Sequence, residues 1–181
     1  MAEILDKVDA RDRVLGTTTK HEAHEKGFIH RVSAVFVFTD DRKILVQLRG
    51  DNNLLDHSVG GHVRSGEVYE AAAARETEEE LGVDMKLKQI GKFLGDERLA
   101  KRAPGFQVVH YFTLYEGHLG KKDIGKLRLL SEEVKEVIPM DLEELREMMG
   151  ARPLSFSPGF MHSYNFYVAK KKLGLPKVNV V

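Results

Sequence analysis

The segment between residues 61 and 83 constrains the fold more than any other part of the sequence. It begins with a glycine-rich stretch and continues into residues 68–81, which are dominated by alanine and glutamate, two residues that favour helices. Gly82 follows directly, and a glycine just beyond the last helical turn commonly ends a helix. The sequence therefore predicts a helix from Val68 to Leu81 that is entered from a glycine loop.

Three glutamates of this predicted helix share one face. Because a helix has about 3.6 residues per turn, the carboxylates of Glu76, Glu79 and Glu80 lie within about one turn of each other. Like charges so close repel, unless a divalent cation binds between them. Oxygen ligands suit Mg²⁺ or Mn²⁺, and bound Mg²⁺ usually also contacts substrate phosphates. Solvated glutamate faces are common too, so the triplet indicates a metal site only together with its neighbours.

Composition excludes several classes of protein. With 181 residues, 42% of them hydrophobic, the chain is long enough for one core, and one domain is expected. The 28 basic and 28 acidic side chains balance, which disfavours binding to long nucleic acids or membrane surfaces. The absence of cysteine excludes disulfide scaffolds and thiolate sites. Because the sequence shows no apolar leader and no run near the ~20 apolar residues of a membrane span, we expect a soluble, cytoplasmic protein.

The remaining segments predict strands and helices in alternation. Residues 32–39 and 43–47 are β-branched and apolar and flank the turn Asp40-Asp41, which is typical of a hairpin. Further predicted elements are a small hairpin that turns at 9–13, strands over 86–94, 107–116 and 134–139, and helices over 141–149 and 157–173. We expect a mixed α/β (α+β) fold in which the tail after Leu175 is loosely held.

The spacing of the fixed residues between 61 and 83 resembles the signature of the Nudix hydrolases. The sequence meets it at Gly61, Glu67, Arg75-Glu76, Glu79-Glu80 and Gly82-Val83, and departs from it only at Thr77, where an aliphatic residue is usual. The resemblance implies a Nudix-like α/β/α sandwich, with a mixed sheet flanked by helices. The implied single domain covers residues 1–181, with 1–27 as an N-terminal extension containing the small hairpin and 28–175 as the core.

The resemblance also implies roles for the residues of the motif. The metal ligands would be Glu76, Glu79 and Glu80 together with the Gly60 carbonyl, and Glu67 would support them and touch the Mg²⁺ or Mn²⁺ through water. Arg75 would orient the glutamates by an ion pair. In the implied reaction, a metal-activated water attacks a phosphorus atom of a diphosphate, with Glu79 and Glu80 taking part and Glu80 as the base. Bases outside the motif also occur in this family, and the candidates are Glu97, Glu132, Glu133 and Glu136.

Segments outside the motif resemble the branch of the family that includes the isopentenyl diphosphate isomerases. These segments are KHEAHEKGFIHR, ILVQLR and PLSFSPGF. In those isomerases histidines and glutamates bind a metal, and His24, His30 and His62 match the histidine positions; packed or solvated histidines are the alternative. The catalytic cysteine and glutamate of the isomerases are missing, because Gly60 and Gln107 stand at or near their positions.

We therefore expect a divalent-metal-dependent hydrolase that cleaves the diphosphate linkage of a nucleoside-diphosphate-type small molecule. An isomerase of isoprenoid diphosphates and a non-catalytic nucleotide sensor are the alternatives. Candidate phosphate contacts are Arg49 and Arg98, with Lys101 and Arg102 beside them. Aromatic residues that either stack on a base or belong to the core are Phe93, Phe106, Tyr111 and Phe112.

The expected partner is the small-molecule diphosphate itself, with no membrane and no long nucleic acid. A homodimer is common among soluble proteins, and the pair Met148-Met149 is a candidate contact for one as well as a candidate part of the core.

Overall fold

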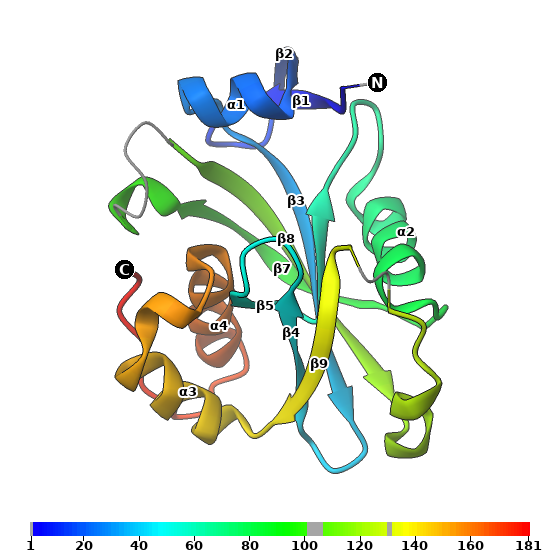
Figure 1. Ribbon diagram of the computed structural model, residues 1–181. Coiled ribbons are helices and arrows are strands. Elements are labelled where there is room, and N and C mark those ends of the chain that lie inside the picture. Colours follow the sequence, from blue (N-terminus) through cyan, green and yellow to red (C-terminus); the bar gives the residue numbers. More distant parts are fainter. Residues whose placement is uncertain (1, 101–106, 130–131) are drawn as a thin grey trace.

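Strand β3 (His30–Thr39), formed by the β-branched and aromatic run of the sequence, lies at the centre of the sheet (Figure 1). In the computed structural model, which describes residues 2–100, 107–129 and 132–181, nine strands join one mixed sheet. Along one edge β3 pairs in parallel with β8 (Val109–Leu119). Its antiparallel partners are, in turn, β1 (Ile4–Val8), β6 (Val59–His62) and β4 (Ile44–Arg49).

The other strands extend this sheet outward. The remaining strands are β2 (Val14–Thr19) beside β1, β7 (Lys88–Asp96) beside β8, and β5 (Leu55–Asp56) and β9 (Val134–Met140) beside β4. The helices are α1 (Lys20–Lys26), α2 (Tyr69–Leu81), α3 (Leu142–Ala151) and α4 (Pro158–Lys170), with the short 3₁₀ helices η1 (Glu97–Ala100), η2 (Lys121–Lys126) and η3 (Pro153–Ser155). Within the described parts of the chain, no helix is long and apolar enough to cross a membrane.

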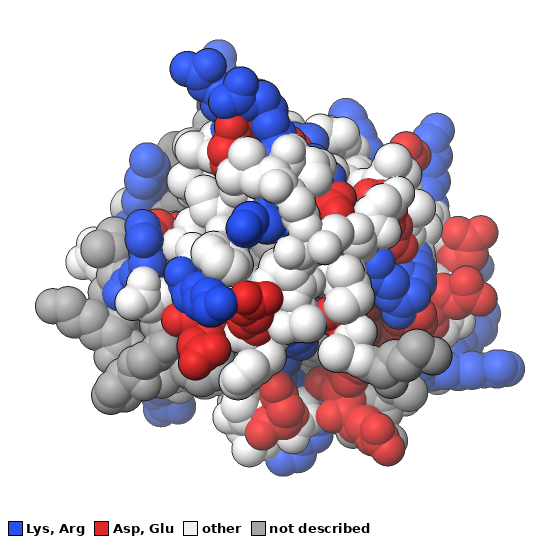
Figure 2. All heavy atoms as spheres, turned by 90° about the horizontal axis from the view of Figure 1, so that it is seen from above, with Lys and Arg blue, Asp and Glu red and all other residues white. Residues whose placement is uncertain are grey.

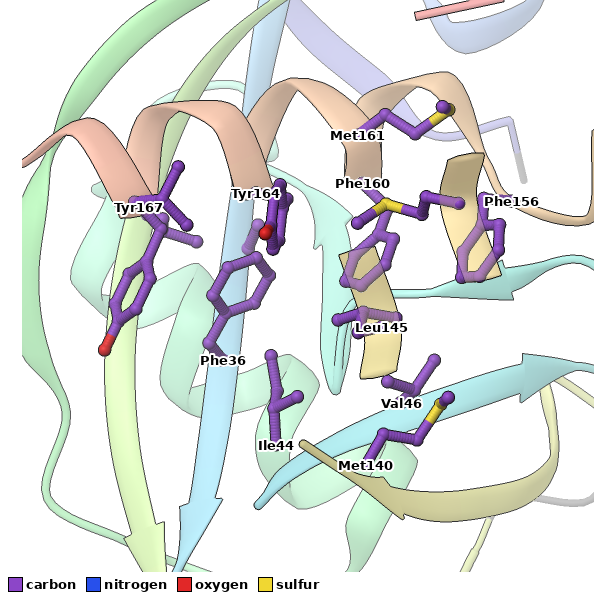
Figure 3. Packing of buried hydrophobic residues seen from close by; sticks show 14 of the residues in the cluster. Phe36, Ile44, Val46, Met140, Leu145, Phe156, Phe160, Met161, Tyr164 and Tyr167 are labelled. Carbon is purple, nitrogen blue, oxygen red and sulfur yellow. The ribbon is translucent and has the colours of Figure 1, made fainter. Parts of the chain in front are cut away.

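Helices cover both faces of the sheet because successive side chains of a strand point to opposite sides. From β3, Phe36 packs in one cluster with Tyr164 of α4 and Leu145 of α3 (Figure 3). Phe38 belongs to the same cluster. Val35 and Val37 pack in a second cluster with apolar residues of α2. The predicted α/β/α sandwich, with a mixed sheet flanked by helices, is therefore confirmed.

The helix that carries the glutamates agrees with its prediction to within one residue. α2 begins at Tyr69, with Val68 as its N-cap, and ends at Leu81. Gly82 follows in the left-handed conformation, with φ of 66°, which a glycine adopts without steric cost.

Two regions near the ends of the chain differ from the predictions. Helix α1 was not predicted, because its seven residues form too few turns to leave a clear periodic pattern in the sequence. α4 ends at Lys170 rather than at Leu173. The tail was expected to be loosely held, but the Asn165 side chain makes two hydrogen bonds of 2.8 Å with the backbone of Val178, and these bonds anchor the tail on α4.

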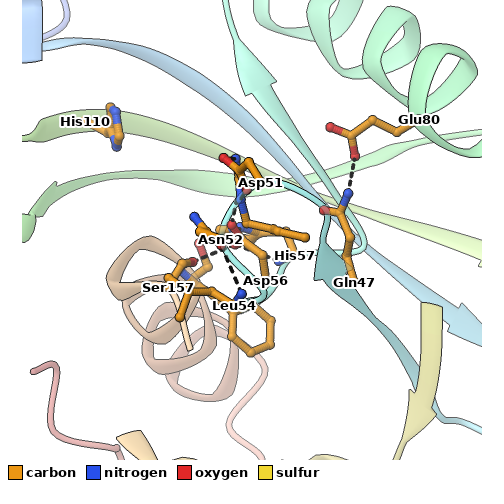
Figure 4. A network of polar contacts seen from close by, with 12 residues as sticks. Gln47, Asp51, Asn52, Leu54, Asp56, His57, Glu80, His110 and Ser157 are labelled. Atoms are coloured by element: carbon orange, nitrogen blue, oxygen red, sulfur yellow. Dashed lines mark hydrogen bonds and ion pairs between the residues drawn. The ribbon is translucent and has the colours of Figure 1, made fainter. Parts of the chain in front are cut away.

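A buried carboxylate, Asp56 at the end of β5, joins the sheet to the start of α4 (Figure 4). It accepts hydrogen bonds from the His57 ring at 2.7 Å and from Ser157 Oγ at 2.7 Å, and it pairs with Arg49 at 3.2 Å. The other ring nitrogen of His57 lies 2.6 Å from Ser163 Oγ on α4. Burial opposes ionisation of Asp56, but the hydrogen bond from His57 and the charge of Arg49 hold its pKa well below the usual range.

We expect the substitution Asp56→Ala to lower the free energy of unfolding by about 3 kcal/mol, because it leaves several buried polar groups without their partner. Urea denaturation measures this change. Asp51→Ala is the matched control: its carboxylate also pairs with Arg49, but it is 55% exposed, so the expected loss is below about 0.5 kcal/mol. Equal losses in the two variants would contradict this role of Asp56.

Candidate active site

A cavity of about 660 Å³ lies beside strand β6 and is bounded by α1, α2, η1 and the start of α4. Most of the residues that line this cavity are polar. Glutamates of α2 contribute to one part of the lining, and histidines from α1, β6 and β8 contribute to another. The residues of these two groups are Glu76, Glu79 and Glu80, and His24, His62 and His110. The cavity therefore brings together the motif of the sequence and histidines from distant segments.

Gly61 allows α2 to approach β6 closely. A Cβ atom at Gly61 would lie 2.1 Å from the carboxyl group of Glu76, far inside the contact distance of two atoms. At Gly60 the nearest atom to such a Cβ lies 3.7 Å away, on His57, which is an ordinary contact. A side chain at Gly61 would therefore displace the Glu76 carboxylate, whereas a Cβ atom at Gly60 would make only ordinary contacts.

Arg75 connects the helix, the preceding loop and the strand. Its guanidinium lies 2.6 Å from Glu76, 3.1 Å from Glu79 and 3.0 Å from Glu67. It also donates a hydrogen bond to the backbone carbonyl of His62 at 3.1 Å. Arg75 is therefore held by Glu67, and it fixes the orientation of Glu76 and Glu79, two of the three glutamates.

Glu80 and Glu76 are buried carboxylates with too little positive charge around them. Glu80 is 3% exposed, and Gln47 donates a hydrogen bond to it over 3.4 Å (Figure 4). Burial, together with the charges of Glu76 and Glu133, raises the pKa of Glu80 well above its usual value. Burial also raises the pKa of Glu76, although Arg75 offsets part of this shift. Oxygen donors that carry this unbalanced charge fit a hard divalent cation such as Mg²⁺ or Mn²⁺.

A second group of candidate ligands consists of four histidines: His24 on α1, His30 at the start of β3, His62 at the end of β6 and His110 on β8. Their nitrogen atoms lie within 4.8 Å of one another. Burial lowers the pKa of His24, His30 and His110 to about 3, so these rings are neutral near pH 7. His21, from the same segment as His24, is exposed and is not part of this group.

Sequence reasoning found three of these histidines and missed His110. It joins the group because β3 and β8 pair in parallel with His30 opposite His110. The order and register of parallel strands that are far apart in the sequence leave no local signal. In the sequence, a single histidine inside an apolar strand therefore does not indicate a metal ligand.

Of the candidate bases outside the motif, Glu97 and Glu133 line the cavity, while Glu132 and Glu136 are not part of its lining. Glu97 lies 2.7 Å from the Nδ1 atom of His110. Burial raises the pKa of Glu97 to about 7. Neither position of the isomerase catalytic pair offers the catalytic side chain. Gly60 lines the cavity without a side chain, and Gln107 is exposed and outside the lining.

The candidate phosphate contacts lie in different surroundings. Arg49 lines the cavity, but its guanidinium already pairs with Asp51 at 2.9 Å and with Asp56 at 3.2 Å. Arg98 pairs with Asp96 at 2.6 Å on the surface and is not part of the cavity lining. Lys101, Arg102 and the aromatic candidate Phe106 lie outside the described residues.

Two of the aromatic candidates belong to the core. Phe93 stacks on Phe112, with ring centroids 5.0 Å apart, and on Phe166 of α4, at 4.6 Å. Phe112 borders the cavity but is only 2% exposed. Met149, a candidate dimer contact, is also buried in the core. On the face seen in Figure 2, acidic and basic side chains are interspersed, in keeping with the balanced net charge.

We expect Glu80→Gln to raise the thermal midpoint of the metal-free protein at pH 7, because burial and the neighbouring Glu76 and Glu133 make the Glu80 carboxyl group costly to ionise. A carboxyl group whose pKa is raised by folding destabilises the folded state above its ordinary pKa of 4.5. The difference from the wild type should therefore disappear as the pH falls toward 4.5. Leaving a buried polar group poorly compensated costs on the order of 1–3 kcal/mol, and each kcal/mol shifts the midpoint of a chain of this size by roughly 2–4 °C.

Differential scanning calorimetry in a chelating buffer measures this effect. Glu78→Gln is the matched control, since Glu78 is an exposed neighbour on the same helix, and its midpoint is expected to equal that of the wild type. A midpoint of Glu80→Gln at or below the wild-type value at pH 7 would show that the Glu80 carboxyl group does not destabilise the folded protein.

Comparisons with known proteins agree with this geometry. The family model of the NUDIX domain matches residues 29–160. The chain is 32% identical over 172 residues to isopentenyl-diphosphate Delta-isomerase 2 of Photorhabdus laumondii, with 91% of this chain and 92% of the relative covered. It is also 32% identical over 173 residues to the Nudix hydrolase PA4841 of Pseudomonas aeruginosa, with 92% and 94% covered. A prenyl-diphosphate phosphatase of Methanosarcina mazei is 29% identical over 160 residues, with 86% and 89% covered.

The fold has counterparts among solved structures. The crystal structure of DR0079 from Deinococcus radiodurans aligns with a TM-score of 0.66 at 24% identity, over 83% of this chain and 90% of that chain. This likeness concerns the fold. Because the family model covers most of the chain, and relatives match it over nearly its full length, the chain belongs to the NUDIX domain family and is a Nudix hydrolase.

Proposed function

We propose that this protein hydrolyses the diphosphate linkage of a small-molecule substrate with Mg²⁺ or Mn²⁺ as cofactor. The observation that carries the proposal is the pair of buried carboxylates, Glu76 and Glu80, which face β6 with insufficient positive charge around them. Such a site costs stability unless a cation occupies it. The ligands in this proposal are Glu76, Glu79, Glu80 and the carbonyl of Gly60, with Glu67 as support.

The chain's own residues have distinct tasks in the proposed reaction. Arg75 orients Glu76 and Glu79, and Glu67 holds Arg75 in place. A bound cation of this class neutralises phosphate charge and lowers the pKa of a water molecule. Glu80, the proposed base within the motif, accepts a proton from the attacking water. The water oxygen forms a bond to phosphorus, and the bridging P–O bond breaks, with its electron pair leaving on the departing phosphate group.

The local chemistry supports hydrolysis more than isomerisation. Proton transfer to a carbon–carbon double bond needs a positioned acid and base, and position 60 offers no side chain for such a role. Glu97 is a carboxylate in the same cavity, so isomerisation is tested in the same assay as hydrolysis.

For the substrate we propose a nucleoside-diphosphate-type molecule or another small diphosphate ester. The aromatic rings of Phe93 and Phe112 pack against each other in the core, so we do not propose them as stacking partners for a nucleotide base. Because two relatives are named for isopentenyl and prenyl diphosphates, isoprenoid diphosphates are also candidate substrates to be assayed. Arg49, at the cavity wall, is the proposed phosphate contact, while Arg98 would have to leave Asp96 to serve as one.

We expect the wild type with Mg²⁺ or Mn²⁺ to release phosphate-bearing products from at least one member of a panel of nucleoside and isoprenoid diphosphates. Glu80→Gln should reduce turnover about 100-fold or more, because it removes both a ligand and the base. Chromatography of the products measures turnover and detects any isomer. Glu78→Gln is the matched control and should retain wild-type turnover.

Three outcomes would contradict the proposal. The first is equal turnover in Glu80→Gln and Glu78→Gln. The second is migration of a double bond without release of phosphate, which would establish the isomerase. The third is tight binding of a nucleotide with no product under either cation, which would establish a sensor.

The glycines of β6 give a second test. Gly61→Ala should reduce turnover about tenfold or more, because its Cβ displaces the Glu76 carboxylate from a position 2.1 Å away. Gly60→Ala, whose Cβ meets nothing nearer than 3.7 Å, should retain most of the activity. The kinetics of both variants, with circular dichroism as a check on folding, measure the effect. Similar kinetics for the two variants would refute the assignment of Gly61.

A further inference from the structure

We propose that His24, His30, His62 and His110 form a second metal site, for a zinc-type cation, separate from the magnesium-type site at the glutamates of α2. The resemblance to the isomerases implied three histidines completed by glutamates. In this chain the fourth member is a histidine, so the ligand set is entirely imidazole. The inference concerns a group of residues that the proposed hydrolysis does not use.

The four rings come from four different elements and meet at one point. The ring centroids of His30 and His110 are 4.6 Å apart, and those of His30 and His62 are 5.2 Å apart. The ligand nitrogens of all four lie within 4.8 Å of one another. Tetrahedral zinc with bonds of about 2.1 Å needs nitrogens roughly 3.4 Å apart, so small side-chain rotations would complete the coordination.

Hydrogen bonds on the outer ring atoms decide which nitrogen faces inward. His30 donates from Nδ1 to the carbonyl of Phe28 at 2.9 Å, and His110 Nδ1 lies 2.7 Å from Glu97. The Nε2 atoms of His24 and His30 are 3.2 Å apart. A carbonyl or a carboxylate on the outer nitrogen is the usual arrangement around a metal-bound histidine.

Two of the inward nitrogens are unexplained without a ligand. The Nε2 atoms of His62 and His110 are buried and have no hydrogen-bond partner among the described residues. Buried polar atoms nearly always have a partner. A cation bound to all four rings would satisfy both atoms at once.

The chemistry of the ligands separates the two proposed sites. Imidazole nitrogens favour Zn²⁺, Co²⁺, Ni²⁺ or Cu²⁺, whereas carboxylate oxygens favour Mg²⁺ and Mn²⁺. Four protein ligands also close a tetrahedral shell, as in structural zinc sites. Because His24 lies on α1 and the other three rings lie on the sheet, the cation would fasten α1 to the sheet at the wall of the cavity.

The test is a titration of the metal-free, full-length protein with Co²⁺, in which the intense visible absorption of tetrahedral Co²⁺ is measured in the presence of excess Mg²⁺. We expect one Co²⁺ per chain with this spectrum, and a loss of affinity of at least about tenfold in His110→Ala. His118→Ala is the matched control: His118 lies on the same strand but is 69% exposed, and its variant should bind as the wild type does.

Two results would overturn the proposal: no tetrahedral spectrum, or equal affinity in His110→Ala and His118→Ala. If circular dichroism shows that His110→Ala does not fold, His24→Ala on the short helix α1 replaces it and must show the same loss. The variant Glu80→Gln separates this inference from the proposed hydrolysis. It should keep the Co²⁺ spectrum while losing turnover with Mg²⁺, and loss of the spectrum in Glu80→Gln would assign the Co²⁺ to the glutamates instead.

Discussion

The arrangement of the cavity depends on the guanidinium of Arg75. One side chain, only 17% exposed, meets carboxylates of the loop and of its own helix, and also the backbone carbonyl of His62. A planar guanidinium can serve several acceptors in fixed directions, which the single ammonium of a lysine cannot do. Arg75 therefore sets the position of α2 relative to β6, and with it the positions of Glu76 and Glu79.

Strand β6 approaches different functional groups on its two faces. Side chains alternate along a strand, and a Cβ at Gly61 would point toward Glu76, whereas one at Gly60 would point toward His57. His62, two residues after Gly60, belongs to the histidine group. The four-residue strand thus approaches Glu76 of α2 at Gly61 and contributes His62 to the histidine group, so both proposed cation sites involve β6.

Local patterns predicted the elements that are stabilised locally. The run before Thr39 formed β3, and the alanine- and glutamate-rich segment ended at Gly82 as expected, because propensity and capping act over a few residues. The meeting of His30 with His110 was not predictable, since it depends on a parallel pairing across about eighty residues. The anchoring of the tail through Asn165 and Val178 likewise depends on tertiary contacts that leave no periodic signal.

Overall similarity does not decide between hydrolysis and isomerisation, because the chain is 32% identical both to an isomerase and to a Nudix hydrolase. The two glycines of β6 are more informative. At Gly61 the carboxyl group of Glu76 occupies the space that a Cβ atom would need. A Cβ atom at Gly60 would make only ordinary contacts, so crowding at that atom does not account for the missing cysteine. With a complete glutamate motif and no acid at position 60, the same scaffold is suited to attack at phosphorus rather than to protonation of carbon.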